Sequence, residues 1–237
     1  MVYGKNITLD QLERIKLRPP KKHGARWQGI KHIDLVNTIL TECKTRHWKV
    51  RGVELSVARQ GADLAGAIMV DIPSLPQIPG QIYAIGFMHS NWKWRPLTIA
   101  VGTNVRVCNN GMVTGVHVLR EKHEKNLDLA AQIHVGLDRY LEAAKDIKNQ
   151  VDLMRARNLT EAEADHLLMQ CGRQGIMPWN RVKLVDHEYR HPTFAEHSER
   201  TSWGLLNAFT YIVKQSPPQE QMDSINAFRR LLPVGRN

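Results

Sequence analysis

The order of hydrophobic patterns along the chain is the feature that most restricts its fold. Residues 49–118 consist of short β-rich runs separated by turn residues, whereas the segments before and after them show helical spacing. Because β-rich runs and helical segments do not alternate, nothing requires the long crossover connections of a parallel sheet. We therefore predict an α+β fold with an N-terminal helix, an antiparallel β-meander and long C-terminal helices.

Turn residues divide the β-rich region into runs that we expect to pair as neighbours. Gln60-Gly61-Ala62-Asp63 predicts a hairpin, and Asn109-Asn110-Gly111 predicts a tight turn because these residues accept positive φ angles. The sheet part is expected over about 49–119, with strands at 50–59, 64–72, 81–89, 97–101, 104–107 and 112–119.

Helical spacing flanks this region on both sides. An apolar stripe within residues 31–48 consists of Ile33, Val36, Ile39, Leu40 and Cys43. Farther along, the pair Thr160 and Glu163 has the spacing of a capping box, which marks the start of a helix. The expected C-terminal helices cover 127–157, 160–172, 202–215 and 219–232, with an irregular segment at 176–192.

The composition is that of a globular protein with an N-terminal extension. Hydrophobic residues make up 42% of the 237 residues and charged residues 24%, which excludes a disordered or collagen-like chain. Because Pro19 and Pro20 interrupt any helix, residues 1–30 are expected to form a flexible basic arm. Residues 31–232 would then form a single domain, whose helical part covers about 126–232.

The sequence also suggests where the chain resides and which cofactors it lacks. No apolar run is long enough to span a bilayer, and the N-terminus has no apolar signal segment. Three widely spaced cysteines form no disulfide framework, which is typical of a reducing cytosol. Neither a G-x-G-x-x-G motif nor a P-loop is present. We therefore expect a cytoplasmic protein without a cofactor and without a membrane partner.

Positive charge is concentrated in two parts of the chain. The formal net charge is +10, and residues 1–51 hold 12 Lys or Arg against 4 Asp or Glu, a net of +8. Residues 93–125 add a net of +4, whereas residues 126–237 hold equal numbers of both signs. Clustered positive charge is typical of a polyanion partner such as nucleic acid, although a solvated basic surface has the same composition.

The candidate nucleic-acid residues lie in these two basic blocks. In Trp92-Lys93-Trp94-Arg95 the indoles can stack on bases while the cations hold phosphates, although the tryptophans could instead cover the sheet. The arm, which also contains Arg18, Trp27 and Lys31, can follow a nucleic-acid backbone or pack on a neighbouring subunit. The candidate binding residues are Lys21, Lys22, Arg26, Trp92, Lys93, Trp94, Arg95, Arg106, Arg120 and Lys122.

A zinc-protease-like pattern provides the main enzymatic alternative. His187-Glu188-Tyr189-Arg190-His191 matches H-E-x-x-H, and His197 follows six residues later, which resembles the metzincin arrangement. Phe194 replaces the glycine that this arrangement needs, and the following Pro192 disfavours helical geometry at His191. We therefore expect a non-enzymatic protein and keep the zinc-dependent hydrolase as the third alternative.

Two further patterns favour structural roles. Cys108 follows Val105 and Val107 in a strand pattern and is expected to be buried, while Asn109 and Asn110 either shape the turn or present their amides to a ligand. Within 202–215, Trp203, Leu206 and Thr210 share one helical face that is expected in the core, with Asn207 as a buried, hydrogen-bonded neighbour.

Several stretches resemble a family of phage and plasmid-like proteins defined by a domain of unknown function. The similarity is carried by Ile85–Asn91, by Gly102–Gly111 and by Arg200–Thr210, and it extends over about residues 31–232. The sequence departs from the family pattern at Met88, where Arg is common, and at Trp92, where Asp is common. The resemblance implies a mobile-element origin, and its order of elements is similar to that of phage single-strand annealing proteins of the Red-beta and Rad type.

Together these observations predict an oligomeric phage-type protein that binds single-stranded nucleic acid and acts in recombination or strand annealing. A basic groove with aromatic platforms suffices for that role, so no catalytic residue is required. The alternative is a non-enzymatic phage protein that binds or inhibits a host factor.

Overall fold

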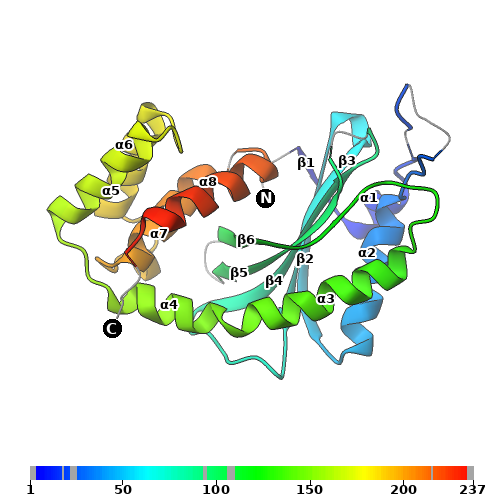
Figure 1. Ribbon diagram of the computed structural model, residues 1–237, viewed down its shortest axis with the longest axis horizontal. Coiled ribbons are helices and arrows are strands. Elements are labelled where there is room, and N and C mark those ends of the chain that lie inside the picture. The colour runs from blue at the N-terminus through cyan, green and yellow to red at the C-terminus, as the bar shows by residue number, and fades with distance from the viewer. Residues whose placement is uncertain are drawn as a thin grey trace.

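A computed structural model describes residues 4–17, 19–21, 26–92, 95–105, 110–214 and 216–233. The fold is α+β, as predicted, with a central antiparallel sheet and long C-terminal helices (Figure 1). Within the described residues, no helix combines the length and the hydropathy that crossing a membrane requires.

The sheet is a six-stranded meander in which each strand pairs antiparallel with its neighbours in sequence. The strands are β1 (Lys5–Ile7), β2 (Lys49–Ala58), β3 (Asp63–Asp71), β4 (Gln81–Ser90), β5 (Leu97–Val105) and β6 (Asn110–Glu121). The hairpin expected at residues 60–63 is formed through a short 3-10 turn, Arg59–Gly61.

Two details of the sheet differ from the sequence predictions. The two short runs expected around Gly102 form the single strand β5, because Gly102 pairs with Ala84 on one side and Val113 on the other. Asn110 and Gly111 begin β6 rather than lying in a turn. Cys108 and Asn109 lie outside the described residues.

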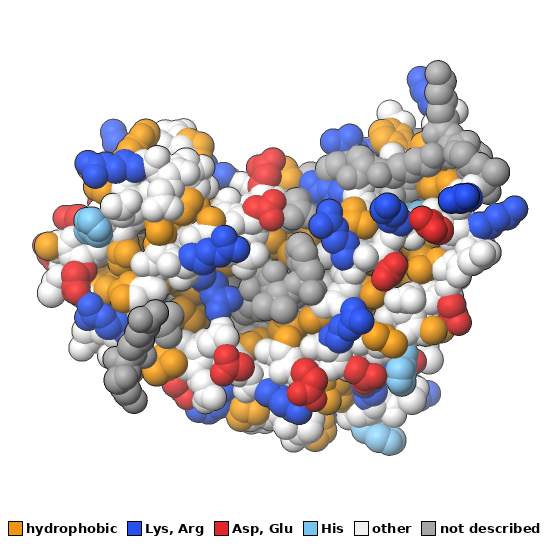
Figure 2. All heavy atoms as spheres, in the orientation of Figure 1, with side chains coloured by type: hydrophobic (Ala, Val, Ile, Leu, Met, Phe, Trp, Pro, Cys, Tyr) orange, Lys and Arg blue, Asp and Glu red, His pale blue; other side chains and the backbone are white. Residues whose placement is uncertain are grey.

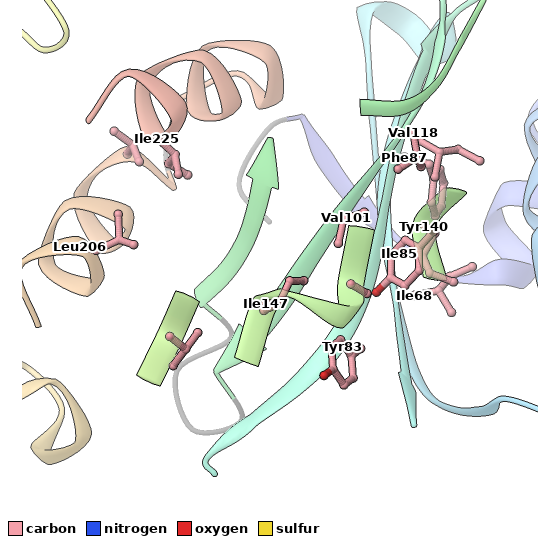
Figure 3. Packing of buried hydrophobic residues seen from close by; sticks show 14 of the residues in the cluster. Ile68, Tyr83, Ile85, Phe87, Val101, Val118, Tyr140, Ile147, Leu206 and Ile225 are labelled. Carbon is pink, nitrogen blue, oxygen red and sulfur yellow. The ribbon is translucent and has the colours of Figure 1, made fainter. Parts of the chain in front are cut away.

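One face of the sheet carries the main hydrophobic core. The register places Ile68, Ile85 and Val101 side by side on β3, β4 and β5, so that β-branched side chains stack across the strands. Helices α2 (His32–Thr45) and α3 (Leu129–Lys145) pack against this face. Tyr140 of α3 lies directly over it (Figure 3). The apolar stripe predicted for residues 31–48 is buried in this way.

The opposite face of the sheet is lined by smaller residues. Ala65, Met88 and Ala100 from three successive strands form a buried cluster with Met222. Met222 belongs to α8 (Pro218–Leu231), so the last helix lies against this second face. The sheet is therefore covered by α2 and α3 on one face and contacted by α8 on the other.

The C-terminal helices follow the prediction with two corrections. The stretch expected as one helix is divided at Asp146 into α3 and α4 (Ile147–Ala156). The segment expected to be irregular contains α6 (Trp179–Arg190), which begins after Pro178 and buries Val182, Val185 and Tyr189. Their spacing of three and four residues is the helical signal that the expectation missed.

Helices α5 and α7 agree with their sequence signals. Helix α5 (Glu161–Arg173) begins with the predicted capping box, in which Thr160 Oγ1 accepts from Glu163 N and the Glu163 carboxylate accepts from Thr160 N. Helix α7 (Ser202–Val213) is buried along almost its whole length, including Trp203 and Asn207.

Residues 5–13 differ from the expected flexible arm. Thr8 caps a short helix, α1 (Leu9–Glu13), through a capping box with Gln11, and Leu12 of this helix is fully buried. Strand β1 pairs with the free edge of β2. These contacts hold residues 5–13 on the domain.

The hydroxyl of Tyr140 provides a test of this core. The side chain is fully buried, and its Oη has no hydrogen-bond partner among the described residues. A buried unpaired hydroxyl is destabilising, so Tyr140→Phe should raise the free energy of unfolding by about 1 kcal/mol. Tyr140→Ala should lower it by about 3–5 kcal/mol because it leaves a cavity. Urea unfolding measures both changes, and a marked loss of stability in Tyr140→Phe would contradict the assignment.

Candidate nucleic-acid interface

The end of the sheet brings the second basic block together. Leu97 at the start of β5 is paired with Glu121 at the end of β6, so the chain before β5 lies beside the chain after β6. Arg95 lies two residues before this pair and Lys122 one residue after it. One residue earlier on β6, Arg120 is paired with Thr98 across the ladder.

The arm supplies a third segment beside these two. Trp27 forms an antiparallel bridge with Glu124, and the amide of Lys125 donates to the carbonyl of Arg26 at 2.7 Å. A Cβ atom on Gly29 would lie 3.0 Å from the Trp27 ring, so glycine at this position lets the indole lie close to the backbone. Residues 26–28 thus add a short extended segment to the sheet end.

A pocket of about 550 Å³ lies where the three segments meet. Its described lining consists of Arg26, Trp27, Arg95, Pro96, Arg120, Lys122, His123 and Glu124. Figure 2 shows Lys and Arg side chains gathered on the upper right of the molecule, the side of the N-terminal segment in Figure 1. Arg26 of the first basic block thus lines the same pocket as Arg95, Arg120 and Lys122 of the second.

The described lining of this pocket carries more positive than negative charge. Four lining residues are cations and one, Glu124, is a carboxylate. Arg26, Arg120 and Lys122 are exposed and form no ion pair with any residue that the structure describes. The guanidinium of Arg95 reaches the sulfur of Met88 at 3.8 Å. Such a site attracts an anion.

Asn91 fixes the position of the arm. Its Oδ1 accepts from the amide of Ile30 at 3.0 Å, and its Nδ2 donates to the carbonyl of the same residue at 2.9 Å. Asn91 is 1% exposed, and its own amide donates to the carbonyl of Ala62. The side chain thereby ties the chain after residues 26–28 to the loop that follows β4.

Three buried histidines lie below the pocket. His32 at the start of α2 is hydrogen-bonded through Nδ1 to Nε2 of His89 at 2.8 Å. The His89 ring stacks on that of His123, with ring centroids 5.2 Å apart. His123 lines the pocket and is 7% exposed, and neither of its ring nitrogens has a hydrogen-bond partner among the described residues.

The carbonyl of Gly61 determines which ring nitrogens of His32 and His89 carry a proton. It can only accept, so Nε2 of His32, at 2.8 Å, must carry a proton. Nδ1 of the neutral His32 then accepts from Nε2 of His89. Burial lowers the pKa of His32, lowers that of His89 well below its usual value and lowers that of His123 to about 4, so all three are neutral at pH 7.

The structure brings four of the ten candidate residues into this pocket. These are Arg26, Arg95, Arg120 and Lys122. Lys21 and Trp92 are exposed but are not among the described lining residues, and the Trp92 amide donates to Ser90 Oγ at 3.1 Å. The remaining candidates, Lys22, Lys93, Trp94 and Arg106, lie outside the described residues.

Sequence reasoning missed two parts of the site. Trp27 lies in the basic arm and follows Arg26 directly, but it is not among the predicted binding residues. The histidines His32, His89 and His123 carry no local signal, because they come from a helix, a strand and a connection far apart in the sequence. Only the antiparallel register and the packing of α2 bring them together.

The H-E-x-x-H segment has structural contacts of its own. Helix α6 ends at Arg190, and His191 leaves helical geometry at φ −130° and ψ 71°. The buried Glu188 accepts hydrogen bonds from the amide and hydroxyl of Thr193 at 2.9 and 2.7 Å. The described part of the chain holds no group of three or more His, Cys, Asp or Glu residues placed to hold a metal ion. Glu188 thus closes the end of its helix.

Comparison with known proteins identifies a family. A family model described as Domain of unknown function (DUF932) matches residues 96–232, which include the last two strands of the sheet, β5 and β6, and the C-terminal helices α3 to α8. No curated protein and no solved structure matches the chain. The family description states no activity.

The histidine cluster predicts a loss of stability in acid. Between pH 6.5 and about 4 the unfolded chain protonates its histidines, whereas the folded chain keeps His123 neutral. The contribution of these histidines to the free energy of unfolding is therefore fully present above pH 6.5. It falls as the pH is lowered, by up to about 1.4 kcal/mol per pH unit for each such histidine. Urea unfolding of wild type and His123→Gln between pH 7.5 and 4.5 measures this effect.

The His123→Gln variant should lose less stability over that range than wild type. His166→Gln, at an exposed histidine, serves as the control and should follow the wild-type curve. The assignment fails if His123→Gln and wild type lose the same stability over the whole range.

Proposed function

Because the chain belongs to the DUF932 family, whose description leaves the activity open, we propose from the site itself that this protein binds single-stranded nucleic acid at the basic pocket. One observation carries the proposal: Arg26, Arg95, Arg120 and Lys122 line one pocket together with Trp27. Cations that hold phosphates beside an aromatic ring that stacks on bases are the usual elements of single-strand binding.

The location of the cations supports phosphate binding over a general solubilising role. Arg26, Arg120 and Lys122 come from two segments far apart in sequence and converge without an acidic partner among the described residues. By contrast, several cations of the C-terminal helices are paired, as the half-buried Arg190 is with Asp165 and Asp186. Unpaired charge at a concave site is available to an anionic ligand.

Strand annealing within an oligomer, in the cytoplasm of a phage host, is the biological role that we propose for this binding. Annealing needs two strands held with their bases accessible, and it needs no covalent chemistry. The role is therefore compatible with a site made of cations, an indole and neutral histidines. A protein that instead recruits or inhibits a host factor would present the same charges to an acidic protein surface.

Charge removal at the pocket tests the proposal. Arg120→Ala combined with Lys122→Ala should weaken binding to a labelled single-stranded oligonucleotide by about tenfold at moderate salt. The slope of log affinity against log salt should fall by about 0.7 for each phosphate that the variant no longer neutralises. Fluorescence anisotropy over a salt series measures both quantities.

A matched control separates the pocket from overall charge. Arg139→Ala combined with Lys183→Ala also removes one Arg and one Lys, from exposed helical positions outside the pocket lining. This control should bind as wild type does. Equal reductions of affinity in both double variants would show that binding depends on net charge, and absence of wild-type binding at low salt would favour the host-factor alternative.

A further inference from the structure

The shape of the basic pocket suggests which part of a strand enters it. A volume of about 550 Å³ lies within the range of sites that enclose a small molecule, roughly 300–1,000 Å³. A strand that passes through a binding site instead contacts a groove over several nucleotides, on the order of 4–16 for one common fold. The pocket therefore matches the end of a strand better than its interior.

The charge of the lining favours a terminal phosphate. Four cations and one carboxylate line the described part of the pocket, which leaves a formal excess of three positive charges. An internal phosphodiester carries one negative charge, whereas a phosphomonoester carries about 1.5 to 2 at neutral pH and presents three acceptor oxygens. Guanidinium groups such as those of Arg26 and Arg120 bind such oxygens in pairs.

The uncharged part of the lining can hold the terminal nucleoside. Trp27 is held by its bridge to Glu124 and by the close approach of Gly29, so its indole is already positioned. Pro96 adds a second apolar surface, and the His123 ring lies at the base. Every nucleobase has a face that can stack on an indole, so this contact does not depend on sequence.

We propose that the pocket binds the phosphorylated end of a single strand, with the terminal phosphate among Arg26, Arg120 and Lys122 and the terminal nucleoside against Trp27. This inference rests on the proposed single-strand binding and adds the part of the strand that is recognised. A terminal phosphate would also explain why cations of both basic blocks line one pocket. It occupies a single position, whereas the internal phosphates of a strand are spread along its length.

The test compares oligonucleotides that share one sequence and differ only at their ends. Single-stranded DNA with a 5′-phosphate, with a 3′-phosphate or with hydroxyls at both ends is titrated with wild-type protein by fluorescence anisotropy. A strand one nucleotide longer with hydroxyl ends adds a phosphate without a monoester, which controls for charge. One of the two phosphorylated strands should bind about tenfold more tightly than both hydroxyl-ended strands.

Variants locate the effect in the pocket. Arg120→Ala should abolish the preference for the phosphorylated strand, and Arg139→Ala should preserve it. Trp27→Leu should weaken binding of both strands while retaining the preference, because it removes the stacking surface and keeps the cations. Thermal melting of each variant verifies that the fold is intact.

The possible failures are distinguishable. If all strands bind equally and with salt sensitivity, the terminal-phosphate inference is wrong and single-strand binding remains. If the preference exists but survives Arg120→Ala unchanged, the phosphate is bound elsewhere and the inference is overturned. If no strand binds at low salt, the proposed function itself fails and the inference fails with it.

Discussion

The paired hydrogen bonds between Asn91 and the backbone of Ile30 are the constraint on which the site depends. They join the chain before α2 to the loop after β4, at 3.0 and 2.9 Å, in a buried environment where an unpaired amide would be costly. On one side of this junction α2 packs on the sheet and brings His32 to His89. On the other side residues 26–28 lie along residues 123–125, just after β6, and complete the basic pocket.

Most of the fold could be predicted because its signals are local. The turn at residues 60–63, the apolar stripe of 31–48 and the Thr160 capping box each depend on neighbouring residues, and each predicts its element correctly. The prediction misses α6 although its helical spacing is a local signal, whereas strands β1 and β5 depend on long-range contacts. Strand β5 is continuous through Gly102 because both neighbouring strands pair with it, and β1 exists because β2 offers a free edge.

For the site, too, the sequence predicts which residues take part but not how they come together. Charge clustering places Arg26, Arg95, Arg120 and Lys122 among the predicted binding residues, and in the structure these four line one pocket. Composition could not show that these residues converge, because their meeting depends on the Leu97–Glu121 register and on the bridge from Trp27 to Glu124. No sequence pattern indicates that the buried histidines meet, since each is an isolated residue in its own segment of the chain.

Hydrogen exchange with and without a saturating single-stranded oligonucleotide is the most direct test of whether the three segments form one binding site. Binding should slow exchange together in residues 26–28, in the chain at 95–97 and in residues 120–124, because a ligand in the pocket contacts or orders all three. Helices α5 and α6 lie far from the pocket and should exchange as before (Figure 1). Protection confined to those helices, with the three pocket segments unchanged, would contradict the assignment of the site.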